Sequence, residues 1–198
     1  FRDVYLYAVP EIHVRDMKIT ADYDYENGNG ILTTELDIIG EKDYLIKLTL
    51  IDKNGNKVYE SDTADVSASI PNVMPWSAEQ PDLYTLTAEI TADGEIIETA
   101  ETKVGFRTFE LKNGIMCLNG KRIIFKGINR HEWCAEGGRV VTKEDMLWDI
   151  RFMKRNNINA VRTCHYPNNS IWYKLCDEYG IYLIDETNLE SHGTWQKM

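Results

Sequence analysis

The sequence of 198 residues has no apolar run that approaches the roughly 18 residues needed to cross a bilayer. It also has no basic block, since 22 Lys and Arg stand against 32 Asp and Glu, and the net charge is −10. A chain this acidic is poorly suited to bind nucleic acid or an anionic membrane surface. We therefore expect a globular protein whose partners include neither nucleic acid nor a membrane.

The four cysteines contain no Cys-x-x-Cys pair; they are Cys117, Cys134, Cys164 and Cys176. Three of them lie in apolar or strand-like segments, where a small buried thiol is the usual interpretation. Free thiols favour a reducing compartment, so we expect a cytoplasmic location. The chain starts at Phe1, without an initiator Met or a signal segment, and we expect it to be an internal part of a larger protein.

The first half of the sequence, residues 1–105, has the alternating apolar pattern of β-strands. Clear examples of this alternation occupy residues 31–38, 45–51 and 85–92. The intervening sequences KNGN at 53–56 and DG at 93–94 predict type I′ hairpin turns, because Asn-Gly and Asp-Gly readily adopt positive φ. Short strands at this spacing, with no helical period between them, predict a seven-strand β-sandwich of immunoglobulin type.

The second half, residues 106–198, combines strands with helices. After a hairpin signal at 119–120 the pattern predicts the following elements in order: a strand over 122–128, a helix over 142–157, a strand over 159–164, a helix over 170–180 and a strand over 181–186. Thr142 is a suitable N-cap with Asp145 three residues later, and Gly180 is a suitable helix end.

This alternation implies parallel strands joined by right-handed crossovers. It fits either a small doubly wound α/β sheet or the opening of a (β/α)8 barrel. We favour the second interpretation, in which residues 106–198 hold the first three βα units of a truncated TIM barrel.

Three of the four histidines, His131, His165 and His192, each fall just beyond one of the predicted parallel strands. Ligands bind at that edge in barrels and open α/β sheets. Any one of them could be an ordinary polar loop residue, but three at one edge indicate a site. Arg162 belongs to the same edge, whereas His13 is expected to be an ordinary strand residue.

Glu190 and His192 lie two residues apart in the polar stretch 185–193 (DETNLESHG). In an extended segment such residues point to the same side, so both can contact one cation. Three histidines with a carboxylate would suit zinc, whereas a hard cation bound by oxygen would suit a pocket that holds hydroxyl groups. Three aromatic residues nearby could stack on sugar rings or simply pack at the edge: Trp133, Tyr166 and Trp195.

Several motifs resemble the β-galactosidases of glycoside hydrolase family 2. The most specific are Asn-Arg-His-Glu at 129–132, Arg-x-x-His-Tyr-Pro-Asn at 162–168 and Asn-x-Glu-x-His-Gly at 188–193. The resemblance covers much of the chain after residue 76 and is weak before it. It implies an immunoglobulin-like domain followed by the N-terminal part of a catalytic TIM barrel. The activity it implies is hydrolysis of terminal β-D-galactosides by a retaining double displacement.

The resemblance also implies roles for individual residues. His131 and His165 match histidines that stabilise the galactosyl transition state, and Arg162 matches a supporting arginine near the nucleophile. Glu190 and His192 match two ligands of an active-site Mg²⁺. Histidine is a softer ligand than magnesium usually takes, so the role of His192 as a magnesium ligand does not follow from ligand chemistry alone.

The two catalytic glutamates of the family lie in later barrel segments, and the 198 residues contain no Asn-Glu motif for the acid/base. We therefore expect the parent protein to be the enzyme and this segment alone to be inactive. The alternatives are another family 2 activity (β-glucuronidase or β-mannosidase), a non-catalytic carbohydrate-binding or scaffold segment, and a zinc hydrolase. A homo-oligomeric parent stays a hypothesis.

Overall fold

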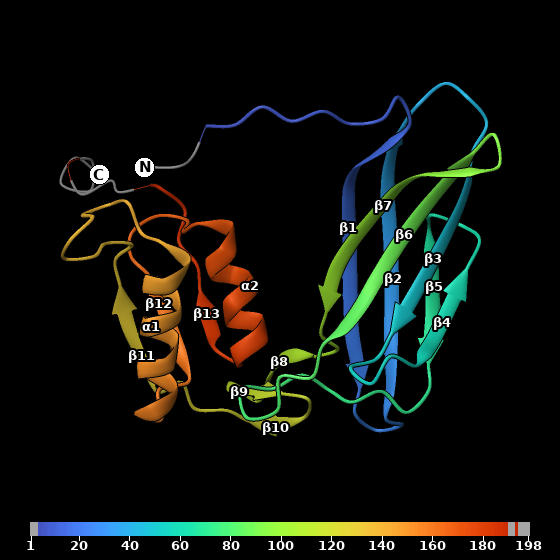
Figure 1. Cartoon of the computed structure of the whole chain (residues 1–198). Helices are drawn as coiled ribbons and strands as arrows, with labels where there is room; N and C mark the ends of the chain where they lie inside the picture. Colours follow the sequence, from blue (N-terminus) through green and yellow to red (C-terminus); the bar gives the residue numbers. More distant parts are fainter. Residues whose placement is uncertain (1–3, 190–192, 194–198) are drawn as a thin grey trace. The chain divides into compact units, whose positions relative to one another are not determined.

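The computed structural model describes residues 4–189 and 193. The chain divides into two compact units, of which one is Tyr5–Ile123 and the other includes Val4 and the residues from Ile124 onward (Figure 1). This division follows the contacts within the chain. It does not test the predicted domain boundary between residues 105 and 106, which stays a prediction.

The first unit contains a sandwich of two antiparallel sheets with seven strands in all. One sheet has the order β1 (His13–Asp24), β2 (Asn29–Ile39), β5 (Val66–Ile70), and the other has the order β4 (Lys57–Ser61), β3 (Leu45–Ile51), β6 (Tyr84–Ala92), β7 (Glu95–Val104). The predicted sandwich is confirmed, and the three alternating segments lie within β2, β3 and β6.

Apolar residues from both sheets meet between the sheets because alternate side chains of each strand face inward, and they form two buried clusters. Leu32 of β2, Leu50 of β3 and Leu86 of β6 are fully buried in the larger cluster, together with Phe106. The Phe106 ring lies directly against the backbone of β2, since a Cβ added at Gly30 would approach it to 2.6 Å. A side chain at position 30 would therefore displace this ring.

The two predicted hairpin turns differ in their outcome. Asp93 and Gly94 have φ of 53° and 82°, as a type I′ turn requires. Between β3 and β4 the hairpin is present, but the predicted turn type is wrong, since only Gly55 of the Asn54–Gly55 pair has positive φ. The Asp52 carboxylate accepts hydrogen bonds from the backbone N–H groups of Asn54 and Asn56 (2.8 and 2.9 Å), and this network stabilises a longer loop.

A small antiparallel sheet ends the first unit, with the order β10 (Lys121–Arg122), β9 (Ile115–Leu118), β8 (Phe109–Lys112). The hairpin signal at Asn119–Gly120 is confirmed by φ of 51° and 74°. The single strand predicted over 122–128 is wrong. Its first residue pairs with β9, whereas Gly127 and Ile128 pair with β12 in another sheet, so the apolar residues between them connect two sheets.

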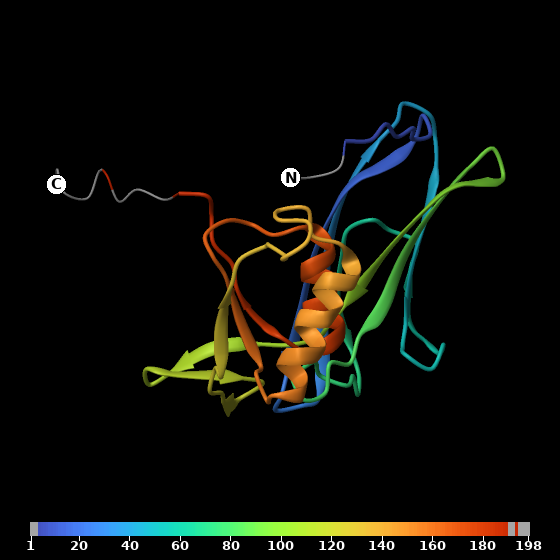
Figure 2. The ribbon, with the colours of Figure 1, turned by 60° about the vertical axis from the view of Figure 1, so that its left-hand side comes forward.

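The second unit has three parallel strands and two helices in alternation: β11 (Gly127–Arg130), α1 (Lys143–Arg155), β12 (Ala160–Thr163), α2 (Ser170–Tyr179) and β13 (Tyr182–Ile184). The sheet order is β11–β12–β13. Both helices pack against it through a core that includes Met146, Ile150, Val161 and Trp172 (Figure 2). A helix that would complete a third βα unit is not among the described residues, and that count stays a prediction.

The helix ends explain where these elements begin and stop. The Thr142 hydroxyl accepts a hydrogen bond from the Asp145 backbone N–H, and the Asp145 carboxylate accepts one from the Thr142 N–H at 2.9 Å. The predicted cap is therefore confirmed. Hydrogen bonds from the Thr142 backbone N–H and hydroxyl to the Asp145 carboxylate lower the pKa of Asp145. Helix α2 is capped by Asn169, which the sequence interpretation did not identify, and it ends at Gly180 with φ of 69°.

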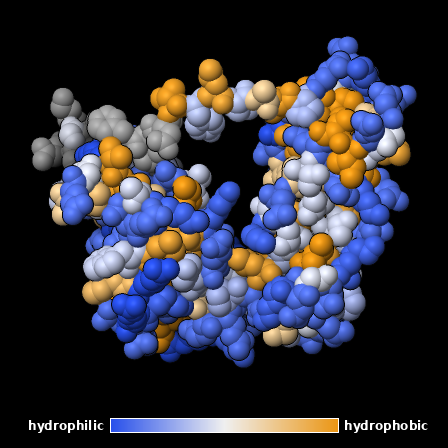
Figure 3. Space-filling view, viewed as in Figure 1, coloured by the Kyte–Doolittle hydropathy of each residue, from blue (hydrophilic) through white to orange (hydrophobic). Residues whose placement is uncertain are grey.

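The visible surface of each unit is largely hydrophilic, with smaller apolar areas (Figure 3). Within the described part of the chain, neither helix is long and apolar enough to cross a membrane. All four cysteines carry free thiols; Cys117, Cys164 and Cys176 are buried, whereas Cys134 is half-buried.

Candidate active site

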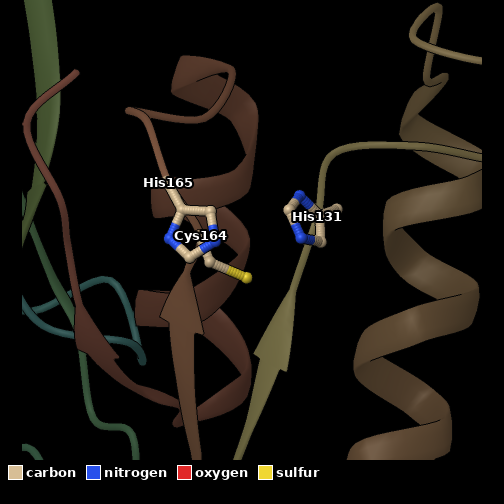
Figure 4. Close-up of side chains that lie close together, drawn as sticks. All are labelled: His131, Cys164 and His165. Atoms are coloured by element: carbon tan, nitrogen blue, oxygen red, sulfur yellow. The ribbon is translucent and has the colours of Figure 1, made fainter. Parts of the chain in front are cut away.

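His131 and His165 lie at the same edge of the parallel sheet. His131 directly follows β11 and His165 comes two residues after β12. Their ring centroids are 5.4 Å apart with the planes at 76°, and the two rings lie close together beyond the strand ends (Figure 4). The structure therefore places both histidines at the edge where the sequence predicts them, and their roles in catalysis stay a prediction.

Arg162 of β12 connects the ends of all three strands. In the parallel register it lies beside Asn129 of β11 and Ile184 of β13. Its guanidinium donates to Glu186 Oε1 at 2.7 Å and to Asn129 Oδ1 at 3.2 Å, and its Nη2 lies 3.2 Å from His165 Nδ1. One side chain thus determines the positions of groups from three consecutive strands.

Glu186 completes this cluster. Its Oε2 lies 3.2 Å from His165 Nδ1, and its other carboxylate oxygen is bound by Arg162. The hydrogen bond from Arg162, followed by the one from His165, lowers the pKa of Glu186, so the carboxylate is charged at neutral pH. An anion, a cation and an imidazole are therefore held together at the sheet edge.

The neighbouring acid, Asp185, forms hydrogen bonds that hold the chain after β13 in place. Its Oδ1 accepts hydrogen bonds from the Thr163 hydroxyl at 2.7 Å and from the Tyr173 hydroxyl at 2.9 Å. Tyr173 OH in turn accepts from the Asn168 backbone N–H at 2.9 Å, and burial raises the pKa of the tyrosine. These bonds fix the segment that carries Glu186, which itself donates its backbone N–H to the Thr163 hydroxyl.

Arg130 anchors the loops that carry the two histidines. Its side chain is 6% exposed, its Nε donates to Asp149 Oδ2 at 2.8 Å and its Nη1 donates to Asn168 Oδ1 at 2.8 Å. The guanidinium carbon lies 3.8 Å from the centroid of the Trp172 ring. Asn168 lies three residues after His165, in the loop that follows β12. Arg130, the last residue of β11, therefore fixes the loop that carries His165.

The motif Asn-Arg-His-Glu alternates between two environments. Asn129 and His131 are exposed at the sheet edge, whereas Arg130 and Glu132 are buried. Glu132 Oε1 accepts a hydrogen bond from the Asn169 backbone N–H at 2.7 Å, next to the start of α2. Alternate residues of one short segment therefore supply the site and its support.

The sequence interpretation missed Glu186 and Cys164 as members of this site. Each of the two lies at the end of a predicted parallel strand, but the contacts that bring it into the site depend on pairing across the sheet. Glu190, His192 and Trp195 lie outside the described residues. The structure therefore does not test the prediction that Glu190 and His192 bind a metal ion. Of the predicted aromatic residues, Tyr166 has its ring centroid 6.4 Å from that of His131, and Trp133 is exposed.

Comparison with known families agrees with this architecture. The family description "Glycosyl hydrolases family 2" matches residues 12–107, and "Glycosyl hydrolases family 2, TIM barrel domain" matches residues 109–198. The chain belongs to glycosyl hydrolase family 2. The predicted family is thereby confirmed, and so is the combination of an immunoglobulin-like domain with barrel sequence.

Similar curated proteins carry the name β-galactosidase. That of Clostridium acetobutylicum is 57% identical over 205 residues, covering 100% of this chain and 23% of the relative. That of Streptococcus thermophilus is 53% identical over 206 residues, covering 100% of this chain and 20% of the relative. The chain thus spans about a fifth to a quarter of the length of these relatives.

The similar solved structures are β-glucuronidases. The Parabacteroides merdae enzyme has a TM-score of 0.82 at 26% identity, covering 90% of this chain and 24% of that chain. The Ruminococcus gnavus enzyme in complex with uronic isofagomine also has a TM-score of 0.82 at 26% identity, covering 90% of this chain and 29% of that chain. These structures have the same fold as this chain, but their sequence identity to it is lower than that of the β-galactosidases.

Proposed function

We propose that the full-length protein hydrolyses terminal β-D-galactosides with retention of configuration. The observation that carries this proposal is the 57% identity to a β-galactosidase over the whole chain. The cluster of His131, His165, Arg162 and Glu186 at the carboxyl edge of the parallel strands supports it, because TIM-barrel enzymes bind their substrates at this edge.

A retaining glycosidase requires two carboxylic acids about 5–5.5 Å apart, one as acid/base and one as nucleophile. Family resemblance assigns both to barrel segments beyond this chain. The residues of this chain then act on the sugar itself. His131 and His165 accept hydrogen bonds from hydroxyl groups of the galactosyl ring, and these bonds strengthen as positive charge develops on the sugar in the transition state.

Arg162 acts in this proposal through its neighbours. Its ion pair with Glu186 keeps a fixed anion beside His165, whose Nδ1 is within 3.2 Å of both groups. A fixed partner on Nδ1 orients the imidazole, so that Nε2 is directed toward the substrate. Orientation of a binding group before the substrate arrives lowers the cost of forming the transition state.

We further propose Glu190 and His192 as ligands of an active-site magnesium ion. Magnesium prefers oxygen ligands but keeps several waters, so that one or two protein carboxylates are sufficient. Glu190 meets this requirement, whereas the His192 imidazole is the softer member of the pair. The ion would supply positive charge near the catalytic acid.

A second family 2 activity has one observation in its favour, since the similar solved structures are β-glucuronidases. Their identity to this chain is 26%, compared with 57% for the β-galactosidase of C. acetobutylicum. The galactoside is therefore the better-supported substrate, and β-glucuronide and β-mannoside are the alternatives.

The test is to assay the full-length protein on matched nitrophenyl β-galactoside, β-glucuronide and β-mannoside. We expect kcat/KM for the galactoside to exceed the other two by at least about 100-fold, equivalent to about 2.7 kcal/mol in transition-state binding. A higher kcat/KM for either alternative would reassign the substrate. The absence of hydrolysis of all three would favour a non-catalytic carbohydrate-binding role.

A further inference from the structure

The site contains a set of three soft metal-binding side chains that the proposed hydrolysis does not use as a set. Donor atoms of His131, Cys164 and His165 all lie within 4.8 Å of one another. The Cys164 sulfur extends into the region between the strand ends, near both imidazole rings (Figure 4). The Cys164 backbone N–H donates to the Arg130 carbonyl at 3.0 Å, which fixes the thiol in register with His131.

These donors match the preferences of zinc-class cations. A tetrahedral Zn²⁺ with Zn–N of about 2.0 Å and Zn–S of about 2.3 Å places its ligands roughly 3.3–3.6 Å apart. The three donors lie within 4.8 Å of one another, and the exposed side chain of His131 has room to move toward a bound cation. Three protein ligands leave a fourth position open to water or a ligand.

The second carboxylate oxygen of Glu186 gives the cluster a feature typical of metal sites. A metal-bound histidine usually donates its other ring N–H to a carboxylate, which fixes the tautomer and raises the basicity of the ligand nitrogen. His165 Nδ1 lies 3.2 Å from Glu186 Oε2. When Nδ1 donates its N–H to this oxygen, the neutral ring is unprotonated at Nε2, which is the form of histidine that binds a cation.

We propose that His131, Cys164 and His165 form a binding site for a zinc-class divalent cation. On binding, the S–H bond of Cys164 breaks, a metal–sulfur bond forms and the proton passes to solvent. Two of the ligands are the histidines assigned above to the sugar. The cation therefore competes with the galactoside, and this second statement rests on the proposed function.

Cobalt is the probe for the binding site, because Co²⁺ replaces zinc and a thiolate–cobalt bond produces a charge-transfer absorption band. The full-length protein, saturated with magnesium to occupy harder sites, is titrated with Co²⁺. The band should appear in wild type and be lost in Cys164→Ser and Cys164→Ala. His131→Ala, at an exposed position that does not threaten folding, should weaken cobalt affinity by at least about tenfold, as the loss of one ligand implies.

Cys134→Ser is the matched control. Cys134 is half-buried and lies outside the cluster, and its replacement should leave the cobalt band intact. Cys176 is a poor alternative ligand, because burial raises its pKa to about 12 and keeps the thiol protonated. A wild-type protein without the band, or a band that persists in both Cys164 variants or is lost in Cys134→Ser, would overturn the proposed site.

Inhibition by zinc tests the competition separately. In galactoside hydrolysis, Zn²⁺ should raise the apparent KM with little change in kcat, and Cys164→Ser should be at least about tenfold less sensitive relative to its own zinc-free rate. A lowered kcat at unchanged KM would contradict competition. A cobalt band without galactoside hydrolysis would support the metal site and contradict the proposed function. Galactoside hydrolysis without the band would support the proposed function and contradict the metal site.

Discussion

Arg162 Nε lies 2.7 Å from Glu186 Oε1, which joins the middle strand β12 to the residues after β13. The same guanidinium reaches Asn129 of β11 and the ring of His165. The carboxyl ends of the three parallel strands are therefore connected by one side chain, at the edge where such sheets bind ligands.

Arg162→Lys in the full-length protein should lower kcat/KM for the galactoside by at least about tenfold. Lysine keeps the positive charge but cannot contact Glu186, Asn129 and His165 at once, and a lost hydrogen bond to a charged group is worth roughly 1.5–3 kcal/mol. Steady-state kinetics measure the effect. Arg151→Lys, on the exposed surface of α1, is the matched control and should leave kcat/KM unchanged. Equal kinetics for the two variants would show that Arg162 has no positioning role.

The ion pair also predicts how stability depends on pH. The pKa of Glu186 is lowered below its usual value of 4.5 by Arg162 and His165, so its charged form stabilises the fold above that value. This contribution is lost as pH falls from about 4.5 through the lowered pKa of the folded state.

Glu186→Gln should therefore be less stable than wild type near pH 7, and the difference should shrink as the pH is lowered past 4.5. Urea unfolding midpoints of the full-length protein, measured at several pH values, test this expectation. A difference that stays constant or grows in acid would mean that the charge of Glu186 does not contribute to stability.

Much of this arrangement could be predicted from local sequence. Alternation located β3 at its observed residues, and Thr142 and Gly180 marked the helix ends, because the underlying interactions involve residues close together in the chain. The error over 122–128 has the opposite origin. An apolar run does not reveal which strand each of its residues pairs with, and here its two ends pair with β9 and β12 in different sheets.

The site shows the same limit. His131, Arg162 and His165 could be located because each lies at or just beyond the end of a predicted strand. The importance of Glu186 and Cys164 depends on register across the sheet, which brings Arg162 level with Ile184 and Cys164 within hydrogen-bonding distance of Arg130. Such pairings join residues more than 20 positions apart and carry no local signal.

The 198-residue chain expressed alone should not hydrolyse a chromogenic β-galactoside above background. A retaining glycosidase needs both an acid/base and a nucleophilic carboxylate, and the chain contains no Asn-Glu motif for the first of them. The assay uses rigorously purified protein at high concentration. Robust turnover that disappears in His131→Ala would show that the catalytic acids lie within these residues.

Glu190→Gln in the full-length protein should weaken the affinity for magnesium and lower the hydrolysis rate. Glutamine keeps the shape of the side chain but removes the negative charge that binds a hard cation, so the rate should fall and recover in part at high Mg²⁺. A magnesium titration of activity measures the shift, with Glu178→Gln on α2 as the control. Unchanged magnesium dependence would make Glu190 an ordinary polar loop residue.

The central claim is that His131 and His165 bind the galactosyl group more strongly in the transition state than in the ground state. The most direct test is kcat/KM of full-length His131→Ala and His165→Ala on a β-galactoside, with His13→Ala in β1 as the control. Loss of a transition-state hydrogen bond of roughly 2–4 kcal/mol predicts a decrease of about 30- to 1,000-fold for the two site variants and none for His13→Ala. Wild-type kcat/KM in both site variants would contradict the account.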